Sequence, residues 1–156
     1  MRIGQGVDIH AFSEDPGRAL VLGGVRIDGE RGLAGHSDAD VVTHALMDAL
    51  LGAACLGDLG RHFPDDDPAT AGVSSLELLD VVLDRVAAAG YVPCSADITV
   101  LAQSPRLASQ LGVMAELLSH RLGTPVSVKA TTTEQLGAIG RSEGIAAMAI
   151  VLVEER

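Results

Sequence analysis

The sequence contains few aromatic residues and few cysteines. Aromatic side chains make up 2% of the 156 residues, whereas 47% of the residues are hydrophobic. The core must therefore be built from closely packed Ala, Val, Leu and Ile side chains rather than from large rings. Cys55 and Cys94 stand alone without a CxxC motif, so we interpret them as reduced packing residues with no redox or metal chemistry.

Basic residues are also scarce. The 11 Lys and Arg residues are outnumbered by 21 Asp and Glu residues, which gives a formal net charge of −10. Binding to a nucleic-acid backbone requires clustered positive charge, so we expect no nucleic-acid partner. A chain this acidic that binds a polyphosphate must obtain positive charge locally, from metal ions, helix N-termini or a few basic side chains.

Long apolar segments are absent as well. The longest run, "IAAMAIVLV" at 145–153, is much shorter than the roughly 20 residues of a membrane span. The first residues, "MRIGQG", contain neither an apolar export signal nor an Arg-rich and Ser-rich import leader. We therefore expect a cytoplasmic protein with no membrane partner. A chain of 156 residues also has the size of one ordinary domain, and we expect residues 1–156 to form a single domain.

Hydrophobic periodicity predicts an α/β fold. Alternating patterns predict strands at 2–10, 96–103, 126–130 and 145–153, and a short hairpin at 19–27 that turns at Gly23 and Gly24. The expected architecture is a mixed sheet of about four main strands packed against three helices, plus the hairpin.

Capping residues and helical spacing predict the three helices. The first covers about 38–56, with Ser37 and Asp38 as candidate N-caps. The second follows Ser74 and ends at Gly90. The third takes Ser104 as N-cap, has Pro105 at its first helical position and ends at Gly123.

The segment "GVDIHAF" at 6–12 carries two polar residues inside an apolar strand. Residues two apart in a strand point to the same face, so Asp8 and His10 should project side by side. By the same alternation, we expect Val7 and Ile9 to point into the core.

The segment "GHSDADVVTHA" provides further polar groups at the start of the first helix. Asp40 and His44 share a helix face at i, i+4, and His36 lies just before the helix. Together with Asp8 and His10, His44 completes one carboxylate and two imidazoles, a ligand set for a catalytic divalent metal with one open position. Zinc is the first candidate by ligand type, and iron or manganese also tolerate such a set.

The spacing leaves alternatives open. Each histidine can instead be an isolated, hydrogen-bonded core residue, because contact between the strand and the helix is an assumption. His62 and His120 have no partner at ligand spacing and are interpreted as surface residues. The helix entry "GHSDAD" at 35–40 could bind a phosphate through its backbone N–H groups, or it could be a capped helix start with no ligand.

A second polar cluster follows the strand at 126–130. The segment "KATTTE" at 129–134 combines a lysine, three threonines and Glu134. Lysine and threonine suit phosphate oxygens, and Glu134 suits a hard cation such as magnesium. A strand end that simply contains threonine is the alternative.

Four segments together resemble the 2-C-methyl-D-erythritol 2,4-cyclodiphosphate synthase family of the non-mevalonate isoprenoid route. They are "GVDIHAF", "AGHSDADVVTHALMDALLGAACLGDLGRHFPDDDP", "LAQSPRL" and "VKATTTEQLGAIGRSEGIAA". Their order and spacing match, and the resemblance covers nearly the whole chain. It implies a lyase that assembles as a homotrimer with active sites between neighbouring subunits.

The resemblance also implies the reaction. The family converts 4-diphosphocytidyl-2-C-methyl-D-erythritol 2-phosphate into 2-C-methyl-D-erythritol 2,4-cyclodiphosphate and CMP. The step is a metal-assisted intramolecular attack of the 2-phosphate on the β-phosphate. The implied partner of the protein is thus a small-molecule cytidine diphosphate ester.

Residue roles follow from the same resemblance. The ligands of Zn²⁺, or of another divalent metal, fall on Asp8, His10 and His44, while Glu134 would hold Mg²⁺ or Mn²⁺ on the substrate diphosphate. The catalytic hydrogen-bond donors fall on His36 and Thr132. Further substrate contacts fall on Ser37, Asp58, Gly60, Phe63, Asp65, Asp67, Ala102, Pro105, Arg106, Leu107, Thr131, Thr133 and Arg141.

Within that set, 63–67 match a segment that closes over the erythritol phosphate, and 102–107 match the cytidine pocket. Arg141 and Glu143 match positions near the trimer axis. Two positions depart from the family pattern. Gln5 stands where many relatives have histidine, and Ala138 stands where some have a phenylalanine that lines a central cavity.

Two other functions are compatible with these residues. A zinc-dependent phosphohydrolase would use the same Asp/His/His set to activate water. A trimeric ligand-binding module would use the metal only structurally, which calls for a closed four-ligand site, whereas the sequence offers three ligands.

Overall fold

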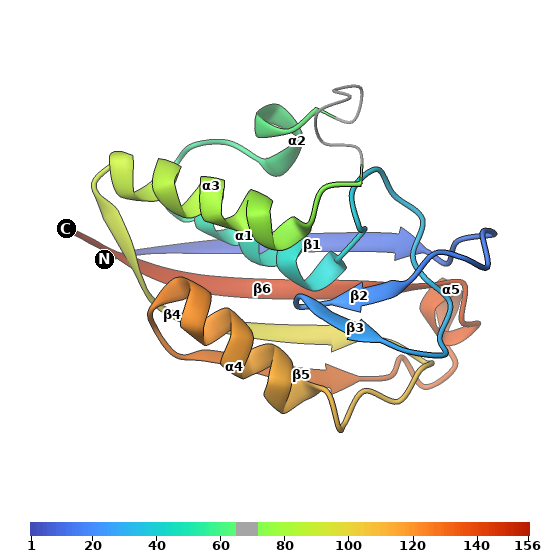
Figure 1. Ribbon diagram of the computed structural model, residues 1–156. Helices are drawn as coiled ribbons and strands as arrows, with labels where there is room; N and C mark the ends of the chain where they lie inside the picture. The colour runs from blue at the N-terminus through green and yellow to red at the C-terminus, as the bar shows by residue number, and fades with distance from the viewer. Residues whose placement is uncertain (65–71) are drawn as a thin grey trace.

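A four-stranded mixed sheet in the order β1-β6-β4-β5 forms the base of the computed structural model, which describes residues 1–64 and 72–156 (Figure 1). Its strands are β1 (Arg2–Ala11), β6 (Gly144–Glu155), β4 (Tyr91–Leu101) and β5 (Val126–Thr131). β6 pairs antiparallel with β1 and with β4, and β5 pairs parallel with β4. β1 and β5 are therefore the two edge strands of this sheet.

Three longer helices cover one face of the sheet (Figure 1). They are α1 (Val41–Ala53), α3 (Ser75–Ala88) and α4 (Leu111–Leu122). α1 packs on β1 and β6, α3 packs on α1, and α4 packs on β5. The mixed α/β sheet and the three main helices predicted from periodicity are confirmed. The short helices α2 (Leu59–His62) and α5 (Gly137–Gly140) were not predicted.

The predicted hairpin is also confirmed. β2 (Leu20–Leu22) pairs antiparallel with β3 (Val25–Ile27). Gly23 and Gly24 form the turn with φ of 57° and 74°. Positive φ at both central residues is the backbone that a two-residue hairpin turn favours, and glycine adopts it without steric cost.

The predicted start of the first helix is wrong. α1 begins at Val41, and its N-cap is Asp40, whose side chain accepts hydrogen bonds from the backbone N–H groups of Val42 and Thr43. Ser37 and Asp38 do not cap α1, because their side chains bond His44 and Ser75 instead.

The predicted start of the third helix is wrong as well. α4 begins at Leu111, after Gln110, which makes no side-chain capping bond. Pro105 follows a cis peptide bond and lies in a loop that Leu107, 4% exposed, anchors in the core. A Ser-Pro pair is a turn signal as well as a helix-start signal, and here the turn prevails.

The strand expected at 96–103 also begins earlier than predicted, at Tyr91. Its register against β6 shifts between Pro93 and Ser95. A proline and a register shift both interrupt the alternation from which a strand is recognised.

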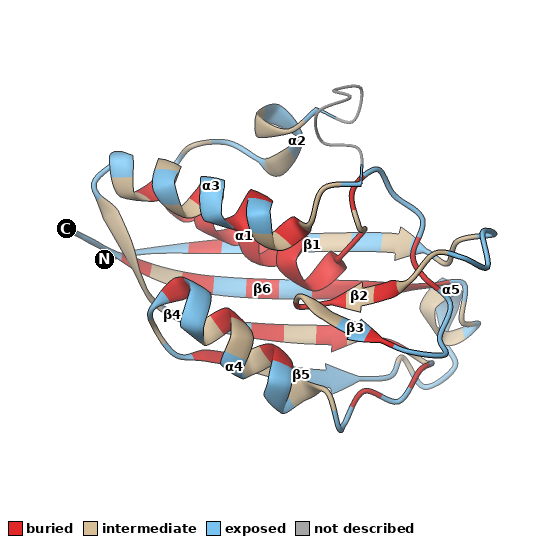
Figure 2. Cartoon of the chain, viewed as in Figure 1, coloured by how far each residue is buried: buried red, intermediate tan, exposed pale blue. Residues whose placement is uncertain are grey.

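The core lies between the sheet and the helices, and α1 is buried on nearly all sides (Figure 2). The expectation that Val7 and Ile9 point into this core is wrong, since they are 44% and 63% exposed. They lie on the sheet face that carries no helix, and Asp8 and His10 therefore lie on the face that packs against α1. Among the residues that the structure describes, no helix has the length and apolarity needed to cross a membrane.

Candidate functional site

Glycines on β1 allow α1 to lie unusually close to the strand. A Cβ atom on Gly6 would overlap the carbonyl oxygen of Ala45 and come within 2.7 Å of the backbone nitrogen of Ala49. Gly4 makes a similar close approach one turn further along α1. This close packing lets His44, on α1, reach Asp8, on β1.

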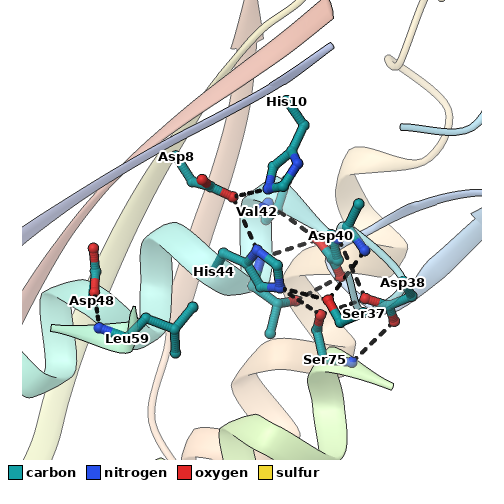
Figure 3. Close-up of polar contacts among 12 residues, drawn as sticks. Asp8, His10, Ser37, Asp38, Asp40, Val42, His44, Asp48, Leu59 and Ser75 are labelled. Atoms are coloured by element: carbon teal, nitrogen blue, oxygen red, sulfur yellow. Dashed lines mark hydrogen bonds and ion pairs between the residues drawn. The ribbon is translucent and has the colours of Figure 1, made fainter. Parts of the chain in front are cut away.

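Asp8, His10 and His44 converge on one point (Figure 3). The Asp8 Oδ2 atom lies 3.0 Å from His10 Nε2 and 3.0 Å from His44 Nδ1. One ligand atom from each of the three residues lies within 4.8 Å of the other two. The structure thus brings together the strand pair and the helix residue whose contact the sequence left open.

The hydrogen bonds of His10 support a cation at this point. His10 Nδ1 lies 2.5 Å from the carbonyl oxygen of Ala34, which can only accept, so Nδ1 carries a proton. In the neutral ring, the bare Nε2 atom then faces the carboxylate of Asp8. Two acceptors this close require a proton or a metal ion between them, and the donor set fits a divalent cation.

Asp8 and His10 shift each other's pKa values. The hydrogen bond to Asp8 raises the pKa of His10, although burial opposes this effect. Burial alone would raise the pKa of Asp8, but its contacts with the His10 and His44 rings outweigh burial and lower the pKa well below its usual range. Asp8 is therefore a carboxylate at neutral pH, as a metal ligand must be.

A cavity of about 310 Å³ lies next to these three residues. Its lining includes the expected contacts His36, Ser37, Gly60 and Phe63. The loop that carries His36 and Ser37 is held by the guanidinium of Arg18, which donates to the carbonyl oxygens of Gly35 and Ser37.

The cavity also contains an acidic residue that the sequence interpretation did not assign. Asp48 lines it, accepts a hydrogen bond from the backbone nitrogen of Leu59 at 2.7 Å, and has a pKa that burial raises. Its spacing of one helical turn from His44 was the signal that could have identified it. Ile9, Leu59 and Leu78 complete the lining.

Other expected contacts lie apart from this cavity lining. Asp58 caps α2 by accepting from the backbone nitrogen of Arg61 at 2.9 Å. Asp65 and Asp67 lie outside the described residues. His62, interpreted as a surface residue, is half-buried: Nε2 contacts the carbonyl oxygen of Leu56 at 2.8 Å, and Nδ1 contacts the Arg85 guanidinium.

A second cavity, of about 380 Å³, is formed by the loop before α4 and the end of β5. Six of its lining residues were expected, namely Ala102, Pro105, Arg106, Leu107, Thr131 and Thr132. Of the other three, Gln103 lies within the range 102–107 expected for the cytidine pocket, whereas Ala108 and Ala130 were not assigned. Ala108 falls in 104–110, which was interpreted as helix.

The remaining expected residues, Thr133, Glu134 and Arg141, are not part of this lining. The Thr132 hydroxyl donates to Glu134 Oε1 at 3.0 Å, and the Thr133 hydroxyl donates to the Leu136 carbonyl at 2.8 Å. Arg141 pairs with Glu143 at 2.6 Å. The first cavity uses edge strand β1 and the second uses edge strand β5, so one chain holds the two groups of residues at opposite edges of the sheet.

Comparison with known proteins supports the resemblance drawn from the four motifs. The model of the YgbB family matches residues 1–154. The chain belongs to the YgbB family. It is 55% identical to the 2-C-methyl-D-erythritol 2,4-cyclodiphosphate synthase of Syntrophobacter fumaroxidans, over 98% of this chain and 97% of that protein. It is also 55% identical to the enzyme of the same name from Symbiobacterium thermophilum, over the full length of both chains.

Solved structures of the family share the fold. The bifunctional IspDF from Campylobacter jejuni is 43% identical with a TM-score of 0.94, over 99% of this chain and 42% of that chain. The IspF of Plasmodium falciparum, solved as a CDP complex, is 32% identical with a TM-score of 0.84, over 99% of this chain and 96% of that chain. The present chain thus aligns with nearly all of the P. falciparum chain and with less than half of the bifunctional one.

Proposed function

We propose that this protein is a lyase that forms 2-C-methyl-D-erythritol 2,4-cyclodiphosphate and CMP from 4-diphosphocytidyl-2-C-methyl-D-erythritol 2-phosphate. An oxygen of the 2-phosphate attacks the β-phosphorus, and the bond from that phosphorus to the oxygen of the α-phosphate breaks. CMP leaves with this oxygen, so no water is consumed. The observation that carries the proposal is the convergence of Asp8, His10 and His44 in a cavity of a chain 55% identical to synthases of this name.

The chemistry requires positioning more than acid–base catalysis. A phosphate monoester loses its second proton near pH 6, so the attacking group is already charged at neutral pH. The protein must instead hold several anionic groups together and in line. This is demanding for a chain with a net charge of −10.

The first cavity is proposed to bind the reacting phosphates. A divalent metal held by Asp8, His10 and His44, with zinc the first candidate, would neutralise phosphate charge when bound. His36 and Ser37 line the same cavity and would hydrogen-bond the substrate. We assign to His36 the stabilisation of charge that grows in the transition state. Asp58, Gly60 and Phe63 would contact the erythritol phosphate.

The second cavity is proposed to bind the cytidine nucleotide. Its lining at 102–107 supplies an apolar slot beside Arg106, and the P. falciparum relative was solved with CDP. Thr131, Thr132 and Thr133 would contact the diphosphate, and Arg141 a further part of the substrate. Glu134, hydrogen-bonded to Thr132, would hold Mg²⁺ or Mn²⁺.

A homotrimer would join the two cavities across subunits. The proposal is supported by the position of β1 and β5 at opposite edges of the sheet, because a substrate that uses both cavities then requires a neighbouring chain. The helix-free sheet face also exposes large apolar side chains, as an interface does. They are Ile3, Val7, Ile9, Met148 and Ile150.

The test is incubation with the cytidine diphosphate substrate, with and without a chelator, followed by phosphorus NMR. We expect a cyclic diphosphate and CMP, both lost when the metal is removed. An open-chain phosphate would favour the phosphohydrolase, and unchanged substrate would favour a ligand-binding module.

A further inference from the structure

A chain of hydrogen bonds leads from His44 away from the metal site to two residues with no assigned role (Figure 3). His44 Nε2 lies 2.9 Å from the hydroxyl of Ser75. That hydroxyl donates to Asp38 Oδ1, and the backbone nitrogen of Ser75 donates to Asp38 Oδ2 at 3.0 Å. Ser75 is fully buried, and His44 is 9% exposed.

The direction of each hydrogen bond in this chain is determined. A carboxylate can only accept, so the one proton of the Ser75 hydroxyl must point to Asp38. The Ser75 oxygen can then only accept from His44, which places the ring proton of His44 on Nε2. The Nδ1 atom, 3.0 Å from Asp8, is left with a bare lone pair, the form that a metal requires.

Two neighbours of His44, Asp8 and Ser37, favour or permit the tautomer with the ring proton on Nδ1. In the absence of a metal, the carboxylate of Asp8 attracts a proton to His44 Nδ1. The hydroxyl of Ser37, 3.1 Å from His44 Nε2, can either donate or accept. Without Asp38 and Ser75, nothing in this contact set would oppose the Nδ1–H tautomer, which cannot bind a metal through Nδ1.

We propose that Asp38 and Ser75 are positioning residues that keep the Nδ1 lone pair of His44 aimed at the metal site. This inference rests on the metal site proposed above. Asp38 also bonds the backbone nitrogen at the first residue of α3, so a purely structural role in helix capping must be separated from control of the tautomer.

Asp38→Asn separates the two roles because it reverses the hydrogen bond to Ser75. The Ser75 N–H keeps the amide oxygen on its own side, since its bond is shorter than the 3.3 Å bond from the Asp40 nitrogen to Oδ1. The amide nitrogen then donates to the Ser75 hydroxyl. The hydroxyl proton turns to His44 Nε2, and the ring proton moves to Nδ1.

Ser75→Ala removes the hydroxyl but keeps the backbone bond to Asp38. Ser74→Ala is the matched control, because the Ser74 hydroxyl caps α3 at Leu76 and has no contact with His44. We expect the Zn²⁺ affinity, measured by competition with a chromophoric chelator, to fall by about 10- to 100-fold in Asp38→Asn and by about tenfold in Ser75→Ala. Ser74→Ala should lower the unfolding midpoint and leave the affinity within about twofold.

Nitrogen-15 NMR of the histidine rings in the full-length, metal-free chain reads the tautomer directly. Spectra recorded above the pH at which imidazoles titrate should show His44 as Nε2–H in the wild type and as Nδ1–H in Asp38→Asn. The signal is assigned by its absence in His44→Ala. A wild-type Nδ1–H tautomer, or wild-type Zn²⁺ affinity in both variants, would overturn the inference. A wild-type chain that fails to bind Zn²⁺ at all would instead contradict the proposed metal site.

Discussion

At the scale of single residues, one buried carboxylate joins two parts of the fold. Asp40 is fully buried and accepts from the backbone nitrogens of Gly23, Gly24, Val42 and Thr43 and from the Thr43 hydroxyl. Burial raises the pKa of Asp40, while the bonds from Thr43 and Gly24 oppose that rise. Because every contact is a donor, the ionised form is the one that satisfies them all. Asp40 thus holds the hairpin turn against the start of α1.

Asp40→Asn should lower the free energy of unfolding by about 1–3 kcal/mol. The amide still caps α1 through its oxygen, and the Thr43 hydroxyl can turn to accept from the amide nitrogen. The Gly24 N–H, 2.7 Å from Asp40 Oδ2, can only donate, so this partly buried donor loses its partner. Urea unfolding measures the loss. Asp28→Asn, on the exposed end of the hairpin, should change stability by less than about 0.5 kcal/mol; equal effects would contradict this account.

His44→Ala should abolish metal binding and synthase activity while the chain still folds. The change removes one of three proposed ligands and leaves the strand and helix in place. Calorimetric titration with Zn²⁺ and product analysis by phosphorus NMR measure the two losses, and circular dichroism reports the fold. His120→Ala, on the exposed side of α4, is the control and should match the wild type. Full activity in metal-free His44→Ala would refute the assignment.

At the scale of elements, the site depends on how closely α1 approaches β1. Gly4 and Gly6 have no side chains on the strand face that α1 covers. They precede Asp8 on that same face of β1. α1 is the most buried helix of the described chain, with only Asp48 and Gly52 of its residues outside the buried set. The same contact that forms the core therefore also assembles the ligand set.

Gly6→Ala should damage stability and metal binding together. Its Cβ would come within 2.9 Å of Asp48 Cβ and closer still to the α1 backbone, so the helix must move away from the strand and carry His44 with it. Overpacking of this kind costs about 1–3 kcal/mol or more. Thermal unfolding and Zn²⁺ titration measure the two effects.

Gly112→Ala is the matched control for this change. A Cβ at Gly112, in α4, meets no heavy atom within 4 Å, and the residue has no positive φ. We expect a gain of about 0.4–1 kcal/mol, because alanine lowers the entropy of the unfolded chain. Unchanged Zn²⁺ affinity in Gly6→Ala would show that the close approach does not set the ligand geometry.

At the scale of the whole molecule, the two faces of the sheet differ. One face is covered by helices, and the other exposes five large apolar side chains on β1 and β6. Figure 2 shows exposed positions along both strands. An apolar sheet face of this kind favours association, and it fits the homotrimer that we propose.

Ile150→Glu should dissociate the proposed trimer. Ile150 is 47% exposed on the helix-free face, and a charge at an apolar interface lacks a partner and loses its hydration. We expect sedimentation velocity to show monomers and synthase activity to fall at least tenfold, while Zn²⁺ still binds. Val113→Glu, at 52% exposure on α4, is the control. A monomeric wild type would contradict the trimer.

Much of this protein follows from local sequence patterns. The presence of the four main strands, the Gly23-Gly24 turn and the Ser74 cap depend on neighbouring residues, and these were predicted correctly. The sequence also placed Asp8 and His10 on one strand face, since that follows from strand geometry alone. The four motifs indicated the family, which the comparisons then confirmed.

Tertiary structure decided the rest. Whether Val7 or Asp8 faces the helices depends on the side from which α1 packs, and alternation cannot specify it. Asp40, Ser37 and Asp38 were all suitable caps for α1, and contacts with the hairpin and with α3 selected Asp40. Ser75 joined the site only through α3, an element distant in sequence from β1. The sequence thus determined which side chains could bind a metal, namely Asp8, His10 and His44. Their convergence on one point required the long-range packing of α1 on β1, and the contact of His44 with Ser75 required the packing of α3 on α1.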